Sequence, residues 1–151
     1  MGLSTSLRYK KLSLSMNFNS ATGYVIYNNT HNTITNIGQF SKGLNSDVKD
    51  FKTTESISDG VAASSRYLEN GNFVKLRNAT LSYMIGDVAG GKVKNLSVFV
   101  SGTNLFVITK FTGFDPEVNV DKSNNNYPSR NMEYIPYPTP RSISFGLNLG
   151  L

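Results

Sequence analysis

The chain has 151 residues, a formal net charge of +5 and an apolar fraction of 38%, which allows one domain and excludes two of ordinary size. No run approaches the roughly 18 apolar residues of a transmembrane helix, and the absence of cysteine excludes a disulfide scaffold and a thiolate metal site. The basic residues are scattered along the chain, so the positive charge indicates a solvated surface and no nucleic-acid partner.

The first two predicted elements are strands joined as a hairpin. Large apolar side chains occupy odd positions from Leu3 to Tyr9 and even positions from Leu12 to Phe18, so the phase changes at the intervening lysine pair. A two-residue turn there pairs position 9 with 12 and position 3 with 18, which places both apolar sets on one face. The opposite face is polar and small-chained. This alternation fits either a soluble β-sandwich or an outer-membrane barrel.

Three further strands and two long loops follow. The strands are expected at residues 73–84, 93–108 and 141–151, and the loops at residues 28–72 and 110–140. The first loop is polar, with one short helix expected in the region 59–67, and the second holds all five prolines. The strand over 93–108 has two competing apolar phases, so its orientation stays open. Connections that alternate short and long are typical of outer-membrane barrels, whose periplasmic turns are short and extracellular loops long.

The last eleven residues alternate between apolar and small or polar side chains. Their apolar members lie on one face of a strand: Ile143, Phe145, Leu147, Leu149 and Leu151. Soluble proteins seldom end on an apolar edge strand, because such an edge invites aggregation. A tilted strand needs about 9–11 residues to cross a bilayer, and this segment has that length.

Two stretches are specific sequence motifs in addition to their alternating pattern. Residues 65–83 read SRYLENGNFVKLRNATLSY, and residues 102–118 read GTNLFVITKFTGFDPEV. Together with the terminal RSISFGLNLGL, they resemble the carboxy-terminal end of the SusC/RagA family of TonB-dependent outer-membrane transporters. The spacing and order match across nearly the whole chain. The departures are Asn72 where serine is usual, Val107 where threonine is usual, and Leu151 where an aromatic residue is commoner.

The resemblance implies an all-β fold, namely an antiparallel up-and-down meander of about five strands. Residues 1–151 would form the carboxy-terminal segment of a transmembrane β-barrel. This barrel would lie in the outer membrane of a Gram-negative bacterium. The same resemblance implies that the parent imports oligosaccharides or peptides with a SusD-like surface lipoprotein. The implied partners are the remainder of the barrel and its plug, the TonB system through that missing plug, and the barrel-assembly machinery. The segment itself is expected to be structural, without enzyme activity, cofactor, metal or catalytic residue, and unable to transport alone.

The resemblance also implies roles for individual residues. The terminal strand resembles an assembly signal through Ser144, Gly146, Leu149 and Leu151. The side chains expected to face lipid are Leu12, Leu14, Met16, Phe18, Leu81, Tyr83, Ile143, Phe145 and Leu147. The second motif contributes Asn104, Leu105, Phe106, Gly113, Asp115, Pro116 and Glu117.

The acidic end of the second motif has two interpretations. It is either a turn, with Asp115 capping and Pro116 fixing φ, or a loop contact for a ligand or partner. Two carboxylates on a loop are too few for a calcium site or for acid/base catalysis. His31 is the only histidine and lies in a polar loop, which excludes a multi-histidine metal site and a Ser-His-Asp arrangement.

One alternative from a different class remains, namely a soluble β-sandwich that binds carbohydrate or another partner through its loops. It explains the alternating strands equally well. It does not explain the two motifs or the apolar end of the chain.

Overall fold

The computed structural model describes residues 1–35, 64–117 and 131–150. The chain forms two compact units. The first unit comprises residues 1–21, 73–109 and 139–151, and the second comprises residues 22–72 and 110–138. Parts of both predicted long loops, and the predicted terminal Leu151, lie outside the described residues.

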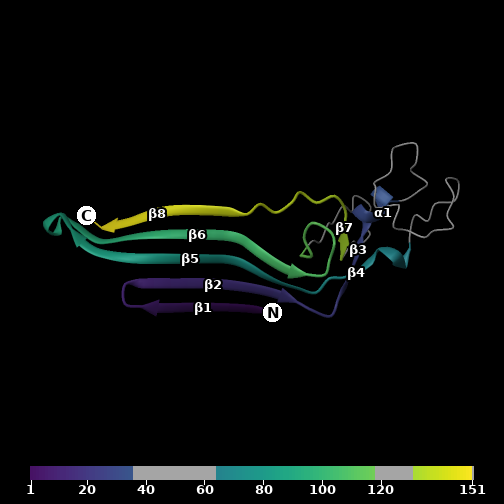
Figure 1. The fold of residues 1–151 in the computed structure, drawn as a ribbon, viewed down its shortest axis with the longest axis horizontal. Coiled ribbons are helices and arrows are strands. Elements are labelled where there is room, and N and C mark those ends of the chain that lie inside the picture. The colour runs from purple at the N-terminus through teal and green to yellow at the C-terminus, as the bar shows by residue number, and fades with distance from the viewer. Residues whose placement is uncertain (36–63, 118–130, 151) are drawn as a thin grey trace, which may run out of the picture. The chain divides into compact units, whose positions relative to one another are not determined.

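The first unit is a five-stranded antiparallel sheet in the order β1-β2-β5-β6-β8 (Figure 1). Its strands are β1 (Gly2–Tyr9), β2 (Leu12–Ala21), β5 (Phe73–Val88), β6 (Val93–Thr109) and β8 (Ser142–Gly150). A short 3-10 helix, η4 (Ala89–Gly91), closes the turn between β5 and β6. The predicted meander of about five strands is therefore confirmed. Strand β5 extends four residues further than its predicted end at position 84, because the turn is tighter than the sequence suggests.

The predicted hairpin register is also confirmed. Tyr9 pairs with Leu12 and Leu3 pairs with Phe18. Lys10, the first turn residue, has φ of 51°, the left-handed conformation that two-residue hairpin turns use.

The two faces of this sheet differ along complete cross-strand rows. One row is apolar on every strand and runs Leu7, Leu14, Leu81, Val100 and Phe145. The adjacent row on the opposite face carries a hydroxyl on every strand and runs Ser6, Ser15, Thr80, Ser101 and Ser144. The sheet is thus apolar on one face and polar on the other.

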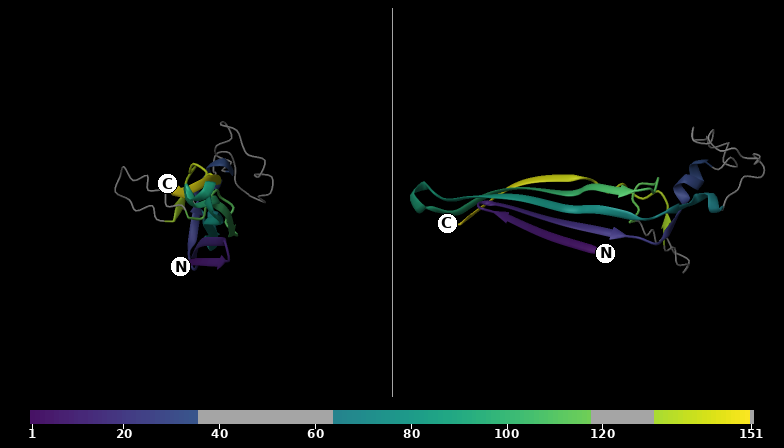
Figure 2. Two further views of the ribbon diagram at one scale, coloured as in Figure 1. Left: turned by 90° about the vertical axis from the view of Figure 1, so that its left-hand side faces the viewer. Right: turned by 60° about the horizontal axis from the view of Figure 1, so that its bottom comes forward.

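The register also settles the orientation of β6, which the sequence left open. Val98 pairs with Tyr83 and Val100 pairs with Leu81, so both valines lie on the apolar face. Phe99 lies on the polar face, where it pairs with Ser82 on one side and Gly146 on the other. Figure 2 shows the five strands side by side in a single twisted layer. A sandwich would need a second sheet packed on the apolar face, and the first unit contains one sheet.

The second unit contains a three-stranded sheet that the sequence analysis did not anticipate. Its central strand β3 (Val25–Asn28) pairs antiparallel with β4 (Leu68–Asn70) and parallel with β7 (Met132–Glu133). The buried core around it includes Ile26, Tyr67 and Phe111. Short strands of two to four residues give little periodicity, which explains why the sequence indicated only loops here.

The helices of the second unit also differ from the prediction. The structure has an α-helix, α1 (Asn29–Thr35), at the start of the segment expected to be irregular, and a 3-10 helix, η3 (Ser65–Tyr67), near its end. The region 59–67 was expected to hold the short helix, and its first five residues lie outside the described residues. Helix α1 begins where the Asn28 side chain accepts a hydrogen bond from the His31 amide at 2.8 Å, the contact of an N-terminal cap. No helix in the described ranges is long and apolar enough to span a membrane.

Candidate functional site

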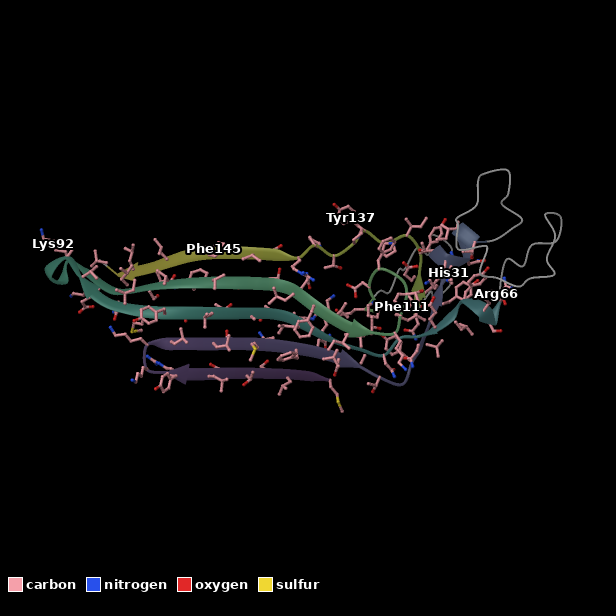
Figure 3. The ribbon with its side chains drawn as sticks, viewed as in Figure 1. His31, Arg66, Lys92, Phe111, Tyr137 and Phe145 are labelled. Atoms are coloured by element: carbon pink, nitrogen blue, oxygen red, sulfur yellow. The ribbon has the colours of Figure 1, made fainter. Side chains whose placement is uncertain are left out.

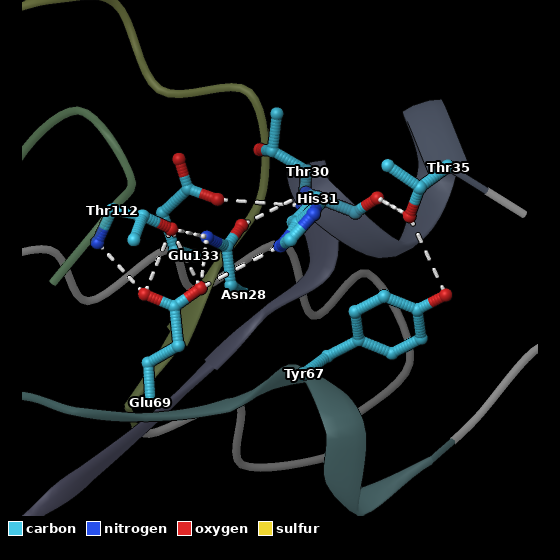
Figure 4. Close-up of polar contacts among 8 residues, drawn as sticks. All are labelled: Asn28, Thr30, His31, Thr35, Tyr67, Glu69, Thr112 and Glu133. Atoms are coloured by element: carbon cyan, nitrogen blue, oxygen red, sulfur yellow. Dashed lines mark hydrogen bonds and ion pairs between the residues drawn. The ribbon is translucent and has the colours of Figure 1, made fainter. Parts of the chain in front are cut away.

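The second unit is organised around one carboxylate, that of Glu69 on β4 (Figure 4). The Thr112 amide donates to Glu69 Oε2 at 2.7 Å, and the Thr112 hydroxyl lies 2.8 and 2.9 Å from the two carboxylate oxygens. Asn28 Nδ2 donates to Oε1 at 2.8 Å, and His31 Nδ1 lies 3.7 Å from the same oxygen. We call these four residues, Asn28, His31, Glu69 and Thr112, the Glu69 cluster.

The electrostatics of the Glu69 cluster favour an ionised carboxylate. Burial opposes ionisation and by itself raises the pKa of Glu69. The hydrogen bonds from Thr112 and Asn28, together with the nearby His31, outweigh that effect and lower the pKa below its usual value. Glu69 therefore remains an acceptor for its donors to a lower pH than an ordinary glutamate would.

A second carboxylate, that of Glu133 on β7, is fully buried beside the helix. Its Oε2 accepts from the Thr30 amide at 3.4 Å, and its Oε1 has no hydrogen-bond partner in the structure. The Thr30 hydroxyl in turn accepts from the Ile135 amide at 2.6 Å. Thr30 thus fixes the segment that follows β7, and Ile135 is held there at φ of 41°.

The second motif forms the predicted turn within the same unit. Asp115 Oδ1 accepts from the Glu117 amide at 3.0 Å, and Pro116 is buried. The Tyr24 hydroxyl donates to the Pro116 carbonyl at 2.8 Å. Burial and the nearby Glu117 and Asp115 raise the pKa of Tyr24, which keeps this hydroxyl protonated as a donor. The turn geometry is therefore as expected, and a ligand or partner contact at this loop stays a prediction.

Close packing explains why the first motif has a glycine at position 71. A Cβ at this position would lie 2.5 Å from Tyr24 Cε2 and 2.9 Å from Ile26 Cγ1, so only glycine fits. Beside it, the Asn72 side chain accepts from the Gly23 amide at 2.8 Å. Residues 71–72 of the first motif therefore pack against β3 and the residues before it.

Asn104 and Leu105 of the second motif belong to the first unit. Asn104 has φ of 51°, a conformation that asparagine tolerates, and its Nδ2 donates to the Pro140 carbonyl at 3.1 Å. Leu105 lies over Gly102, where a Cβ would approach its Cδ2 to 2.6 Å. Phe106, which pairs with Leu76 on β5, is 41% exposed. These residues shape a bulge in β6 and tie it to the segment that enters β8.

All nine residues predicted to face lipid lie on the apolar face of the five-stranded sheet. Phe145, labelled on β8 in Figure 3, is 82% exposed, and Leu147 is 66% exposed. Of the predicted assembly signal, Leu149 lies on this face, Ser144 and Gly146 lie on the polar face, and Leu151 lies outside the described residues.

Sequence reasoning missed most of the residues that organise the second unit. Asn28, Glu69, Thr112 and Glu133 were not among the candidate residues, and His31 was dismissed as an isolated loop residue. Glu69 and Thr112 do belong to the two motifs, which was the available signal. Their 43-residue separation gave no reason to pair them.

The Phe99 ring lies over Gly146 on the polar face, and this contact supports a prediction. A Cβ at position 146 would lie 2.3 Å from Phe99 Cζ. We expect Gly146→Ala to displace the ring, to destabilise the β6–β8 pairing by about 1–3 kcal/mol and to slow assembly of the full-length protein. Folding yield and urea unfolding in lipid vesicles measure this.

A matched control lies on the same strand. At Gly150 the nearest atom to an added Cβ is the Lys94 carbonyl oxygen at 3.4 Å, so Gly150→Ala should be tolerated. The double variant Gly146→Ala/Phe99→Ala should recover part of the loss. Equal effects at the two glycines would refute the ring contact.

No family model matches the chain, but several curated proteins are similar to it over almost its whole length. The chain is 28% identical to TonB-dependent receptor P3 and 32% identical to TonB-dependent receptor P26, both of Formosa agariphila, over 99% and 98% of its length. It is 28% identical over its whole length to TonB-dependent receptor SusC of Bacteroides thetaiotaomicron.

Solved structures share the fold. The RagAB peptide importer in its open-open state matches 99% of the chain with a TM-score of 0.73 at 22% identity, and the RagAB peptide transporter matches 98% with a TM-score of 0.74 at 24% identity. In each, the match covers 17% of the solved chain. The chain spans only 15–16% of the length of the curated relatives.

Proposed function

This chain belongs to the SusC/RagA type of TonB-dependent receptors and is a segment of one, and from that premise we propose that its five-stranded sheet crosses the outer membrane as part of the barrel wall. The apolar face then contacts lipid, and the polar face lines the barrel interior. The observation that carries this proposal is the contrast between the two cross-strand rows, one apolar on all five strands and one hydroxyl-bearing on all five.

Strand dimensions support the same assignment. A tilted transmembrane strand needs about 9–11 residues. Strands β2 and β8 have ten and nine residues, and β5 and β6 have sixteen and seventeen. The longer pair can cross the apolar layer and continue beyond it into a turn. A soluble β-sandwich is not favoured, because its apolar face would be covered by a second sheet, whereas Phe145 on this face is 82% exposed.

We assign the second unit to the extracellular side, where the longer loops of outer-membrane barrels lie. The Glu69 cluster is proposed to hold Asn28, His31, Glu69 and Thr112 together, and the segments 28–72 and 110–140 that contain them are proposed to contact substrate or a surface partner. The cluster itself has no proposed catalytic task. Among the described residues, no group of three or more histidine, cysteine, aspartate or glutamate side chains is arranged to hold a metal ion.

We infer that the full-length receptor imports oligosaccharides or peptides together with a SusD-like surface lipoprotein, coupled to the TonB system through a plug domain. The similarity to TonB-dependent receptor SusC supports coupling to the TonB system, and the fold shared with the RagAB peptide importer supports peptides as a substrate class. In that setting β8 would carry the assembly signal that the barrel-assembly machinery captures by strand pairing.

The lipid-facing assignment predicts opposite environments for two adjacent residues on β2. Leu14 lies in the apolar row and Ser15 in the hydroxyl row. In the full-length receptor reconstituted in vesicles, a spin label at Leu14→Cys should be relaxed by oxygen, which partitions into lipid, and be shielded from a water-soluble nickel reagent. A label at Ser15→Cys should show the reverse. Equal exposure of both labels to the water-soluble reagent would contradict the proposal.

A further inference from the structure

The turns at one end of the five-stranded sheet carry lysines that are far apart in the sequence. Lys10 and Lys11 form the β1–β2 turn, and Lys92 and Lys94 flank the start of β6 after the β5–β6 turn. Both turns close at the same end of the sheet (Figure 1), and Figure 3 places Lys92 at its tip. All four side chains are exposed. The fold therefore places at one end of the sheet lysines that are scattered along the sequence.

Little negative charge opposes these lysines. Residues 1–21, 73–109 and 139–151 contain eight lysines and arginines and a single acidic residue, Asp87. The Asp87 carboxylate accepts a hydrogen bond from the Asn95 amide at 3.0 Å, so it already has a backbone partner. Lys11 Nζ donates to the Ile85 carbonyl at 2.9 Å, which holds that ammonium group at the end of the sheet. This end consequently carries a net positive charge.

Two tyrosines mark the same end of the apolar face. Tyr9 pairs with Leu12, and Leu12 pairs with Tyr83, so the three form one row. The tyrosines are 71% and 47% exposed, and Lys10 Nζ lies 5.5 Å from the centre of the Tyr9 ring. Tyrosine is enriched where a membrane protein passes from the apolar layer into the headgroups, because its ring is apolar and its hydroxyl is polar. The row thus places Lys10 and Lys11 at headgroup depth, and Lys92 and Lys94 lie further out at the same end, beside the Val88–Val93 pair.

We propose that this lysine-rich end binds the phosphate groups of anionic phospholipids in the adjacent leaflet. The proposal rests on the proposed membrane crossing of the sheet. Lysine stems can lie along apolar surface while their ammonium groups reach outward, which suits a surface at the border of the apolar layer. A juxtamembrane cluster of basic residues attracts anionic lipid, and neutral side chains would remove that attraction.

The test uses the full-length receptor in bilayers of equal parts phosphatidylglycerol and phosphatidylethanolamine. Lipids retained after gentle extraction are counted by native mass spectrometry. We expect wild type to retain an excess of phosphatidylglycerol, and Lys10→Gln/Lys92→Gln, with one change in each turn, to lower that excess on the order of tenfold. The control Arg66→Gln/Lys110→Gln removes the same charge from the second unit and should leave the excess unchanged.

Two outcomes separate this inference from the proposed function. If the variant and wild type retain the same excess, or if wild type shows no preference, the lysine surface is refuted while the membrane crossing stands. If wild type fails to float with vesicles, the membrane crossing itself is refuted. If the variant does not assemble, the second measurement is made on wild type in about 0.5 M salt. Salt screens the attraction between the lysines and the lipid phosphates, so the excess of phosphatidylglycerol must fall there. An excess that does not depend on salt would overturn the inference.

Discussion

Replacing Glu69 by alanine is expected to loosen the second unit and to speed amide exchange within it on the order of a hundredfold. The variant leaves the Thr112 amide and hydroxyl and the Asn28 amide group without their carboxylate acceptor. Hydrogen bonds to a charged group contribute about 1.5–3 kcal/mol, which sets the scale of the loss. The measurement is hydrogen–deuterium exchange at Thr112 and at Tyr27, whose amide donates to the Asn131 carbonyl at 2.9 Å.

Variants that remove fewer hydrogen bonds distinguish the contribution of the Glu69 cluster from a general destabilisation by mutation. Glu69→Gln keeps the size and one acceptor oxygen, so its exchange should be intermediate. Thr112→Val removes the hydroxyl and keeps the backbone donor, and it should cost less than Glu69→Ala. Because Glu69→Ala already removes the hydrogen bonds of the Thr112 hydroxyl, adding Thr112→Val to it should have little further effect, so the two effects should not add. Additive effects, or wild-type exchange in Glu69→Ala, would refute a cluster that holds the unit together.

Replacing Leu14 by arginine should destabilise the receptor in a bilayer by about 1–2 kcal/mol, because a basic residue on the lipid face costs about 2–4 kcal/mol at the midplane of a barrel and about 0–1 kcal/mol near its interfaces. Leu14 lies in the apolar row between Leu7 and Leu81, two residues along β2 from Leu12. On the proposed lipid face, an arginine would put a charge among lipid chains. Urea unfolding in vesicles, followed by the mobility shift of the folded barrel on electrophoresis, measures the change.

The matched control is the neighbouring position on the same strand. Ser15 pairs with Ser6 and Thr80, so an arginine there would lie among small hydroxyl side chains on the polar face. We expect Ser15→Arg to change stability by less than about 1 kcal/mol, because substitutions on the interior face of a barrel are better tolerated. If the two arginines cost the same, the sheet does not separate lipid from a polar interior.

The sequence alone determined the two-faced sheet. Strand side chains alternate with period 2, so the positions of Leu3 to Tyr9 and Leu12 to Phe18 were sufficient to predict the hairpin register and the shared apolar face. The two motifs and the terminal strand also predicted the family, and the similarity of this chain to TonB-dependent receptor SusC confirms that prediction. These features are local, since each depends on residues a few positions apart.

Only the tertiary structure decided how the second unit is built. The hydrogen bonds between Glu69 and Thr112 span 43 residues, and the bond between Thr30 and Ile135 spans 105. Short strands and polar helix residues have weak local preferences, so long-range partners determine their conformation. The same reason applies to β6, where two apolar phases were equally plausible until its pairing with β5 and β8 placed Val98 and Val100 on one face and Phe99 over Gly146 on the other.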